Sequence, residues 1–156
     1  MFRKMRLADN MTTEKEAEEM LAAATNGVLA VAGDDGYPYA VPVSFAYEDG
    51  KIFFHSTSDT SHKIDAIRKE PKVSFCVVTQ DEILPKEFNT LYRSAIVFGR
   101  AKVLTDAKEA AHGIMAITKK YSGAYIEEGK AYMAAEAGNF CVVEIAVEHM
   151  TGKAGS

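Results

Sequence analysis

The chain has 156 residues, of which 47% are hydrophobic and 26% charged, and this is the composition of one ordinary globular domain. Its formal net charge of −4 argues against a nucleic acid or an anionic membrane as the main partner. No apolar h-region follows the basic start, and no apolar run reaches the length of a membrane span, so we expect a cytoplasmic protein.

The first part of the chain predicts a helix followed by a hairpin. Thr13 and Glu16 have the spacing of a capping box, an amphipathic run follows them, and Gly27 stands where a C′ glycine would end the helix. Residues 28–32 have the pattern of a strand and residues 33–36 that of a hairpin turn.

Residues 37–47 alternate clearly between aromatic or β-branched residues and smaller ones, which predicts a second strand. Pro38 and Pro42 each remove a donor from the ladder, so this strand is expected at an edge, at a bulge or with an interruption. A tight turn at residues 48–50 leads into a third strand at residues 51–56.

The rest of the chain predicts three more strands and three helical segments. The strands are expected at residues 72–79, 92–104 and 140–149. The helical segments are expected between Ser61 and Pro71, from Thr105 or Asp106 to Tyr121, and, with a weaker pattern, over residues 125–137.

The segments between these elements complete the prediction. Residues 81–90 are expected to be a polar loop and residues 151–156 a polar tail, while Gly99 marks a bulge or a close approach. Six antiparallel strands with helices at the ends and between strands predict a mainly β fold, a small barrel with helical covers.

The two cysteines, Cys76 and Cys141, each lie inside an apolar run that has the pattern of a strand. Buried free thiols that act as small hydrophobic groups are therefore expected. Their spacing indicates neither a disulfide framework nor a metal site, so no metal is predicted.

The most informative segment joins the third strand to the helix that ends before Pro71. It carries a cluster of hydroxyls together with His55, His62 and Lys63. Hydroxyls and a lysine at a helix N-terminus suit a phosphate, because the first backbone N–H groups of a helix are unpaired and its dipole is positive there. The alternative is that Thr60 or Ser61 only caps the helix and Lys63 is solvated.

Several segments, taken in this order, resemble one known group of proteins. They are residues 36–44, 50–55, 61–63, 71–76, 92–101 and 148–153. Together they resemble the FMN-binding split-barrel superfamily, which includes the pyridoxamine 5′-phosphate oxidases, and within it the Nim-type, 5-nitroimidazole reductase-like proteins. The resemblance covers the chain from Gly27 to its end, and it implies a six-stranded antiparallel split β-barrel with helical covers, as a single domain over residues 1–156.

The resemblance implies a homodimer that binds FMN at its subunit interface. The residues expected at the FMN phosphate are Ser56, Thr57, Ser61 and Lys63. The residues expected along the flavin ring are Pro42, Val43 and Ser44.

Four further residues are expected near the cofactor. His55 is predicted to contact FMN or substrate and to exchange a proton near neutral pH, the alternative being a strand-end histidine with a structural role. His62 is expected to donate to the phosphate or to face solvent. Arg93 and Ser94 open the fifth strand, and in a split barrel this edge approaches the flavin of the partner subunit.

The function implied is that of an FMN-dependent reductase that takes electrons from NAD(P)H and passes them to a small electrophile such as a nitroaromatic. The alternatives are a non-catalytic FMN-binding or redox-sensing protein, or a split barrel that binds haem or a deazaflavin. The arginine-rich end of the oxidase branch is missing, since no arginine follows Arg100, so oxidation of pyridoxamine phosphate is not expected. No nicotinamide fingerprint is present, which leaves NADH and NADPH both open.

Overall fold

The computed structural model describes residues 1–57 and 59–156, so Ser58 of the hydroxyl cluster lies outside the described residues. The strands are β1 (Gly27–Ala32), β2 (Pro38–Val43), β3 (Ala46–Glu48), β4 (Lys51–Ser56), β5 (Lys72–Leu84), β6 (Asn89–Val103) and β7 (Cys141–Gly155). The helices are α1 (Glu14–Ala23), α2 (His62–Lys69), α3 (Ala107–Ser122) and α4 (Ile126–Ala135).

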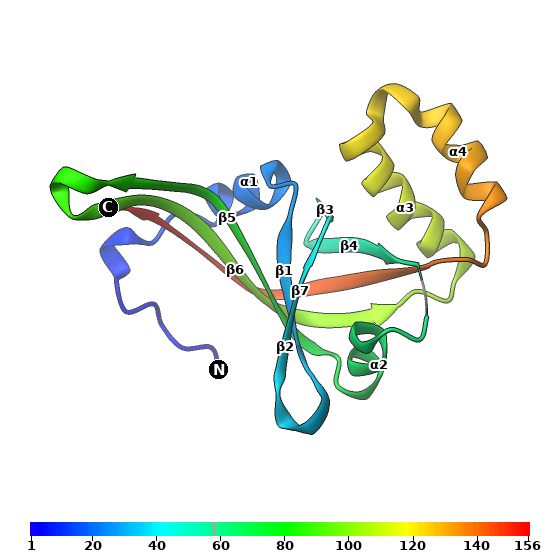
Figure 1. Cartoon of the computed structure of the whole chain (residues 1–156), viewed down its shortest axis with the longest axis horizontal. Helices are drawn as coiled ribbons and strands as arrows, with labels where there is room; N and C mark the ends of the chain where they lie inside the picture. Colours follow the sequence, from blue (N-terminus) through cyan, green and yellow to red (C-terminus); the bar gives the residue numbers. More distant parts are fainter. Residues whose placement is uncertain (58) are drawn as a thin grey trace.

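The strands form one antiparallel sheet of seven strands in the order β2-β1-β5-β6-β7-β4-β3 (Figure 1). Its two edge strands, β2 and β3, are consecutive in the chain and are separated only by Ser44 and Phe45. So short a link requires the sheet to curl until its edges approach each other. The result is an open barrel, which agrees with the predicted split-barrel architecture.

The number of strands differs from the prediction, because residues 37–47 form two strands instead of one. At the break, the hydroxyl of Tyr121 on α3 accepts a hydrogen bond from the Phe45 N–H at 2.9 Å. The Tyr121 hydroxyl has one hydrogen, which it donates either to the carbonyl oxygen of Phe45 at 2.7 Å or to that of Thr25 at 2.8 Å. The backbone of Phe45 is thus bonded to a helix side chain. The expectation that the prolines mark an edge or an interruption is confirmed.

The predicted polar loop and polar tail are both wrong, because these residues extend the sheet. β5 and β6 continue to Leu84 and Asn89, and β7 pairs with β6 as far as Gly155. Residues 80–93 and 151–155 form an arm that projects from the barrel (Figure 1). Much of the arm is exposed on both faces, so its sequence lacks the apolar alternation that marks a half-buried strand.

The local signals at the helix ends are largely confirmed. The Thr13 hydroxyl accepts from the Glu16 N–H at 3.2 Å while Glu16 accepts from the Thr13 N–H at 2.9 Å, which completes the capping box. Asp106 caps α3. Gly27, however, begins β1 and does not end α1, and a Cβ atom there would overlap the ring of Phe75. Because Gly27 has no side chain, the ring of Phe75 on the neighbouring strand β5 can pack against its backbone.

The predicted irregularity at Gly99 is confirmed. The register between β6 and β7 shifts between Phe98 and Gly99, and a Cβ atom at Gly99 would overlap the carbonyl oxygen of Ala146. A glycine is therefore needed at this position, because a side chain would meet the backbone of β7.

Two hydrophobic cores cover the two faces of the curled sheet. The concave face holds α1 and α2, with Leu21, Ile64 and Ile67 packed on Phe54 and Phe75. The convex face carries α3 over β3, β4 and β7, and this second core is formed by Ala46, Phe53, Leu104, Ile114, Ala116, Ile117 and Val142. Among the described residues, no helix combines the length and the apolar character needed to cross a membrane.

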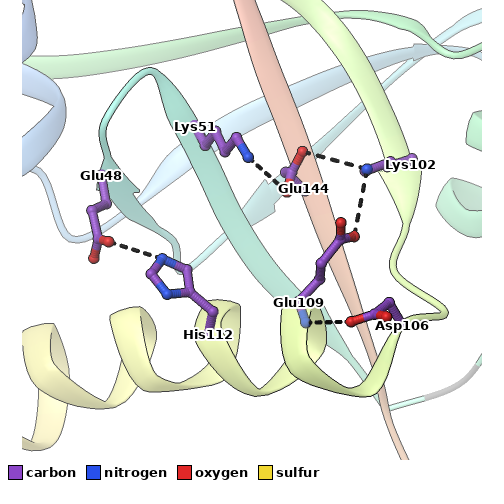
Figure 2. Close-up of polar contacts among 7 residues, drawn as sticks. All are labelled: Glu48, Lys51, Lys102, Asp106, Glu109, His112 and Glu144. Carbon is purple, nitrogen blue, oxygen red and sulfur yellow. Dashed lines mark hydrogen bonds and ion pairs between the residues drawn. The ribbon is translucent and has the colours of Figure 1, made fainter.

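A charged network fixes α3 on the convex face (Figure 2). The carboxylate of Glu144 on β7 is buried and lies 3.5 Å from Lys51 Nζ and 3.9 Å from Lys102 Nζ. Lys102 also lies 3.5 Å from Glu109 of α3, whose backbone N–H donates to the capping Asp106 at 3.0 Å. The two lysines, from β4 and β6, thereby compensate the burial of Glu144, and Lys102 also links it to α3.

Replacing Glu144 by glutamine is expected to lower the free energy of unfolding by about 1–2 kcal/mol. The value is below the roughly 3–5 kcal/mol for breaking a wholly buried pair, because Lys51 and Lys102 are about half exposed and can turn to water. Urea unfolding measures the change. Glu148→Gln, which breaks the exposed pair with Arg100, is the control and should change stability by less than about 1 kcal/mol. Equal effects of the two variants would contradict the role given to Glu144.

Candidate functional site

The N-terminus of α2, where the phosphate is predicted to bind, meets the start of β2. The ring of His62 stacks on Tyr39 with 4.2 Å between centroids. Its Nε2 accepts a hydrogen bond from the Asp34 N–H at 3.3 Å. His62 therefore holds the turn before β2 against α2, and its ring is engaged within the chain and not simply turned to solvent.

Ser61 occupies the N-cap position of α2 but does not act as a cap. Its backbone is extended, as an N-cap requires, yet its hydroxyl accepts no hydrogen bond from the helix. Ser61 Oγ is buried and, among the described residues, has no hydrogen-bond partner. Buried polar atoms without partners are rare in folded proteins, and here the atom stands beside the unpaired N–H groups of a helix. This set of donors fits a phosphate group.

The other residues predicted at the phosphate lie on both sides of Ser61. Lys63 is half-buried in the first turn of α2, and Ser56 is buried at the end of β4. Thr57 is exposed and lines a polar cavity of about 590 Å³ together with Arg68 and Cys141. Burial raises the pKa of the Cys141 thiol, so this half-buried free cysteine is protonated at neutral pH.

The residues predicted along the flavin ring lie at the end of the edge strand β2. Pro42 and Ser44 are exposed, whereas Val43 packs against the concave core. Among the described residues, β2 pairs with β1 alone, so its other edge is free. A proline in an edge strand directs its nitrogen to the unpaired side, so Pro42 costs the sheet no hydrogen bond.

The sequence interpretation missed the part that α3 plays beside these residues. Burial raises the pKa of the Tyr121 hydroxyl, although hydrogen bonds with Phe45 and Ser44 act in the opposite direction. Lys120, the preceding residue, places its ammonium group 4.1 Å from the centroid of the Phe45 ring. The pattern of the helix indicated only an apolar face at Tyr121, and the sequence offers no local signal for contacts with a segment so distant in the chain.

His55 lies on the convex face of the sheet. Phe54 and Ser56 on either side of it are buried, while His55 is exposed and pairs with Val142. Its ring meets Phe140 edge-on with 6.4 Å between centroids. The structure thus places His55 on the opposite face of β4 from its neighbour Ser56.

Arg93 lies at the base of the arm and Ser94 follows it on the opposite face of β6, while the arm extends away from α2 (Figure 1). Ser94 lines a cavity of about 230 Å³ on the convex face together with Phe98 and His149. Within one chain, these two residues are separated from the group around Ser61. Their predicted contact with a flavin requires a second copy of the chain.

The convex face outside α3 is apolar and exposed. The strand register aligns Pro42, Val28, Cys76, Ile96 and Thr151 in one row across five strands. Val28, Ile96 and Phe98 are 40%, 43% and 41% exposed. Phe2 of the N-terminal segment stacks on Phe98 and on His149, so this segment covers one side of the face. Exposed apolar residues grouped on one face are typical of interaction surfaces.

The fold and the sequence match known proteins. A family model described as pyridoxamine 5′-phosphate oxidase matches residues 13–154. A conserved hypothetical protein from Mycobacterium tuberculosis has a TM-score of 0.82 at 22% identity, over 97% of this chain and 90% of that one. A proposed 5-nitroimidazole antibiotic resistance protein from Bacteroides thetaiotaomicron has a TM-score of 0.73 at 21% identity, over 92% and 85% of the two chains.

An FAD-binding protein from Mesorhizobium loti is also similar, with a TM-score of 0.64 at 25% identity over 94% of this chain and 97% of that one. No curated protein matches the sequence at a significant level. The family model covers nearly the whole chain, and the open antiparallel barrel is the architecture that the sequence resemblance implied. The chain therefore belongs to the pyridoxamine 5′-phosphate oxidase family of flavin-binding split-barrel proteins.

Proposed function

We propose that this protein binds FMN and uses it to reduce a small electrophile, such as a nitroaromatic compound, with electrons from NAD(P)H. The observation that carries the proposal is the buried hydroxyl of Ser61 at the N-terminus of α2, which has no hydrogen-bond partner within the described part of the chain. It indicates an anionic ligand that completes the site. The names of two similar proteins, which refer to 5-nitroimidazole resistance and to FAD binding, support a flavin and a nitro compound.

The roles of the residues follow from their positions. Ser61 and Lys63 donate to the phosphate, where a charged acceptor strengthens each hydrogen bond. Pro42, Val43 and Ser44 line the ring along the free edge of β2, and His55 supplies a proton from the convex face. A bound flavin supplies the electron transfer, while the protein binds it, orients it and sets the charge around it.

The absorption spectrum of the purified protein is the first test. The two bands of an oxidised flavin support the proposal, and release of the cofactor by heat followed by chromatography distinguishes FMN from FAD. A Soret band in place of the flavin bands would instead indicate haem. Stopped-flow mixing with NADH and with NADPH then tests the reductase activity. Bound flavin that neither nucleotide reduces would favour the non-catalytic, redox-sensing alternative.

A homodimer through the convex face completes the proposed site. The exposed row around Val28 and Ile96 is available for a second copy, and a two-fold interface pairs the same patch on both subunits. Pro42, His55 and Ser94 all point to this face. In such a dimer, Arg93 and Ser94 of one subunit would lie near the cofactor site of the other, from which they are separated within their own chain.

Replacing Ile96 by aspartate is expected to convert the dimer to a monomer. The change leaves the isolated chain folded because Ile96 is 43% exposed there, but it buries two charges in an apolar interface. Sedimentation at micromolar concentration measures the result, with Tyr132→Asp on the exposed side of α4 as the control. A wild-type protein that sediments as a monomer and still binds FMN would contradict the interface site.

A further inference from the structure

Lys120 is a half-buried cation that forms no ion pair with any residue that the structure describes. Its ammonium group, at the end of α3, donates to the carbonyl oxygen of Ala24 and lies 4.1 Å from the centroid of the Phe45 ring and 5.4 Å from that of Tyr121. Among the described residues, the lysines that form ion pairs are Lys51, Lys102 and Lys130, and no ion pair includes Lys120.

Burying an ammonium group without a counter-charge is unfavourable. Burial lowers the pKa of Lys120, which is the direction expected for a cation that has lost hydration and gained no carboxylate. The bond to Ala24, the residue that ends α1, and the cation–π contact with Phe45 compensate part of this loss. The preceding residue, Lys119, is exposed, so this end of α3 can also hold a lysine whose ammonium group stays in water.

The position of Lys120 connects it to the proposed cofactor site. The next residue, Tyr121, bonds to the backbone of Phe45 and to Ser44, in the link between β2 and β3. This link continues the segment along which the flavin ring is proposed to lie. A flavin ring is neutral when oxidised and gains negative charge on its pyrimidine side when reduced, so a desolvated cation beside it favours the reduced form.

We propose that Lys120 is the positive charge that the protein holds against the flavin ring, and that it raises the reduction potential of the bound cofactor. The inference rests on the proposed function. Hydride transfer from NAD(P)H brings two electrons and one proton to the flavin. The reduction of the flavin therefore needs no proton from Lys120, and Lys120 stays protonated during this step. Its effect is electrostatic, with Tyr121 fixing the β2–β3 link at the same place.

The test is the reduction potential of the flavin bound to Lys120→Met, measured by equilibration with a reference dye. We expect the preference for reduced over oxidised flavin to fall at least tenfold, a potential lower by about 30 mV for a two-electron couple. Lys120→Arg keeps the charge and should stay near the wild-type value. Lys119→Met removes the exposed neighbouring charge and should also leave the potential unchanged. Equal potentials for Lys120→Met and Lys119→Met would overturn the proposal.

A second measurement needs no variant and no turnover. Acylation of the wild-type protein with an amine-reactive reagent, followed by peptide mass spectrometry, should modify Lys120 more slowly when FMN is bound, while Lys119 reacts at the same rate. An unchanged rate at Lys120 in the flavin-loaded protein would overturn the role of Lys120 alone. A protein that binds no flavin at all in titration would overturn the proposed function, and the role of Lys120 with it.

Discussion

Replacing Ser61 by alanine is expected to weaken FMN binding about tenfold to a hundredfold without destabilising the protein. A hydrogen bond to a charged acceptor contributes about 1.5–3 kcal/mol, which corresponds to this loss. An ordinary N-cap serine costs about 0.5–2 kcal/mol of stability when truncated, but Ser61 Oγ bonds to no backbone N–H of α2. Binding titrations with FMN and thermal unfolding of the flavin-free protein measure the two effects separately.

Thr13→Ala provides the matched control. Thr13 is a genuine cap of α1, so its truncation should cost about 1 kcal/mol of stability and leave FMN affinity unchanged. Lys63→Ala should act like Ser61→Ala on FMN affinity. Riboflavin, which lacks the phosphate, should bind the wild type weakly and be insensitive to either change. Equal losses of affinity for FMN and riboflavin would remove Ser61 and Lys63 from the phosphate site.

Replacing His55 by alanine is expected to leave flavin content unchanged and to lower the rate of acceptor reduction about 10²–10⁴-fold. Reduction of a nitro or quinone-like acceptor requires protons, and a general acid contributes about this factor. His55 is exposed on the convex face, where the proposed interface site lies, and imidazole is the side chain whose ordinary pKa suits proton transfer near neutrality. Flavin content and turnover should be measured on the same preparation.

His112→Ala is the control for this experiment. His112 also lies on the convex side, but it pairs with Glu48 at 2.8 Å and holds α3 against the sheet, as Figure 2 shows. Its removal should lower stability and leave turnover per bound flavin unchanged. If His55→Ala also kept its turnover per bound flavin, His55 would have no part in the chemistry, and its contact with Phe140 would be its role.

The sequence alone predicted the features that depend on neighbouring residues. The capping box at Thr13, the helix between Ser61 and Pro71 and the cap at Asp106 follow from spacing within one or two helical turns, and the structure confirms them. The prolines of β2 indicated an edge or an interruption for the same reason, because each removes a backbone donor wherever the strand lies. The hydroxyl cluster at the start of α2 was also visible in the sequence.

Other features were decided only by the tertiary structure. The arm forms strands although its faces are exposed, since its order comes from backbone pairing between β5, β6 and β7 and not from an apolar pattern. The break between β2 and β3 depends on Tyr121, which is far from Phe45 in the chain.

The candidate site shows the same division. A serine that caps a helix and a serine that binds a ligand there have the same sequence pattern. Only the three-dimensional arrangement leaves Ser61 Oγ buried with no hydrogen-bond partner among residues 1–57 and 59–156. Lys120 likewise resembles any lysine at the end of a helix until α1 and Phe45 are packed beside it. Helix periodicity and caps depend on residues a few positions apart, so the sequence shows them directly. Burial and the lack of a counter-charge depend on distant segments that come together only when the chain folds.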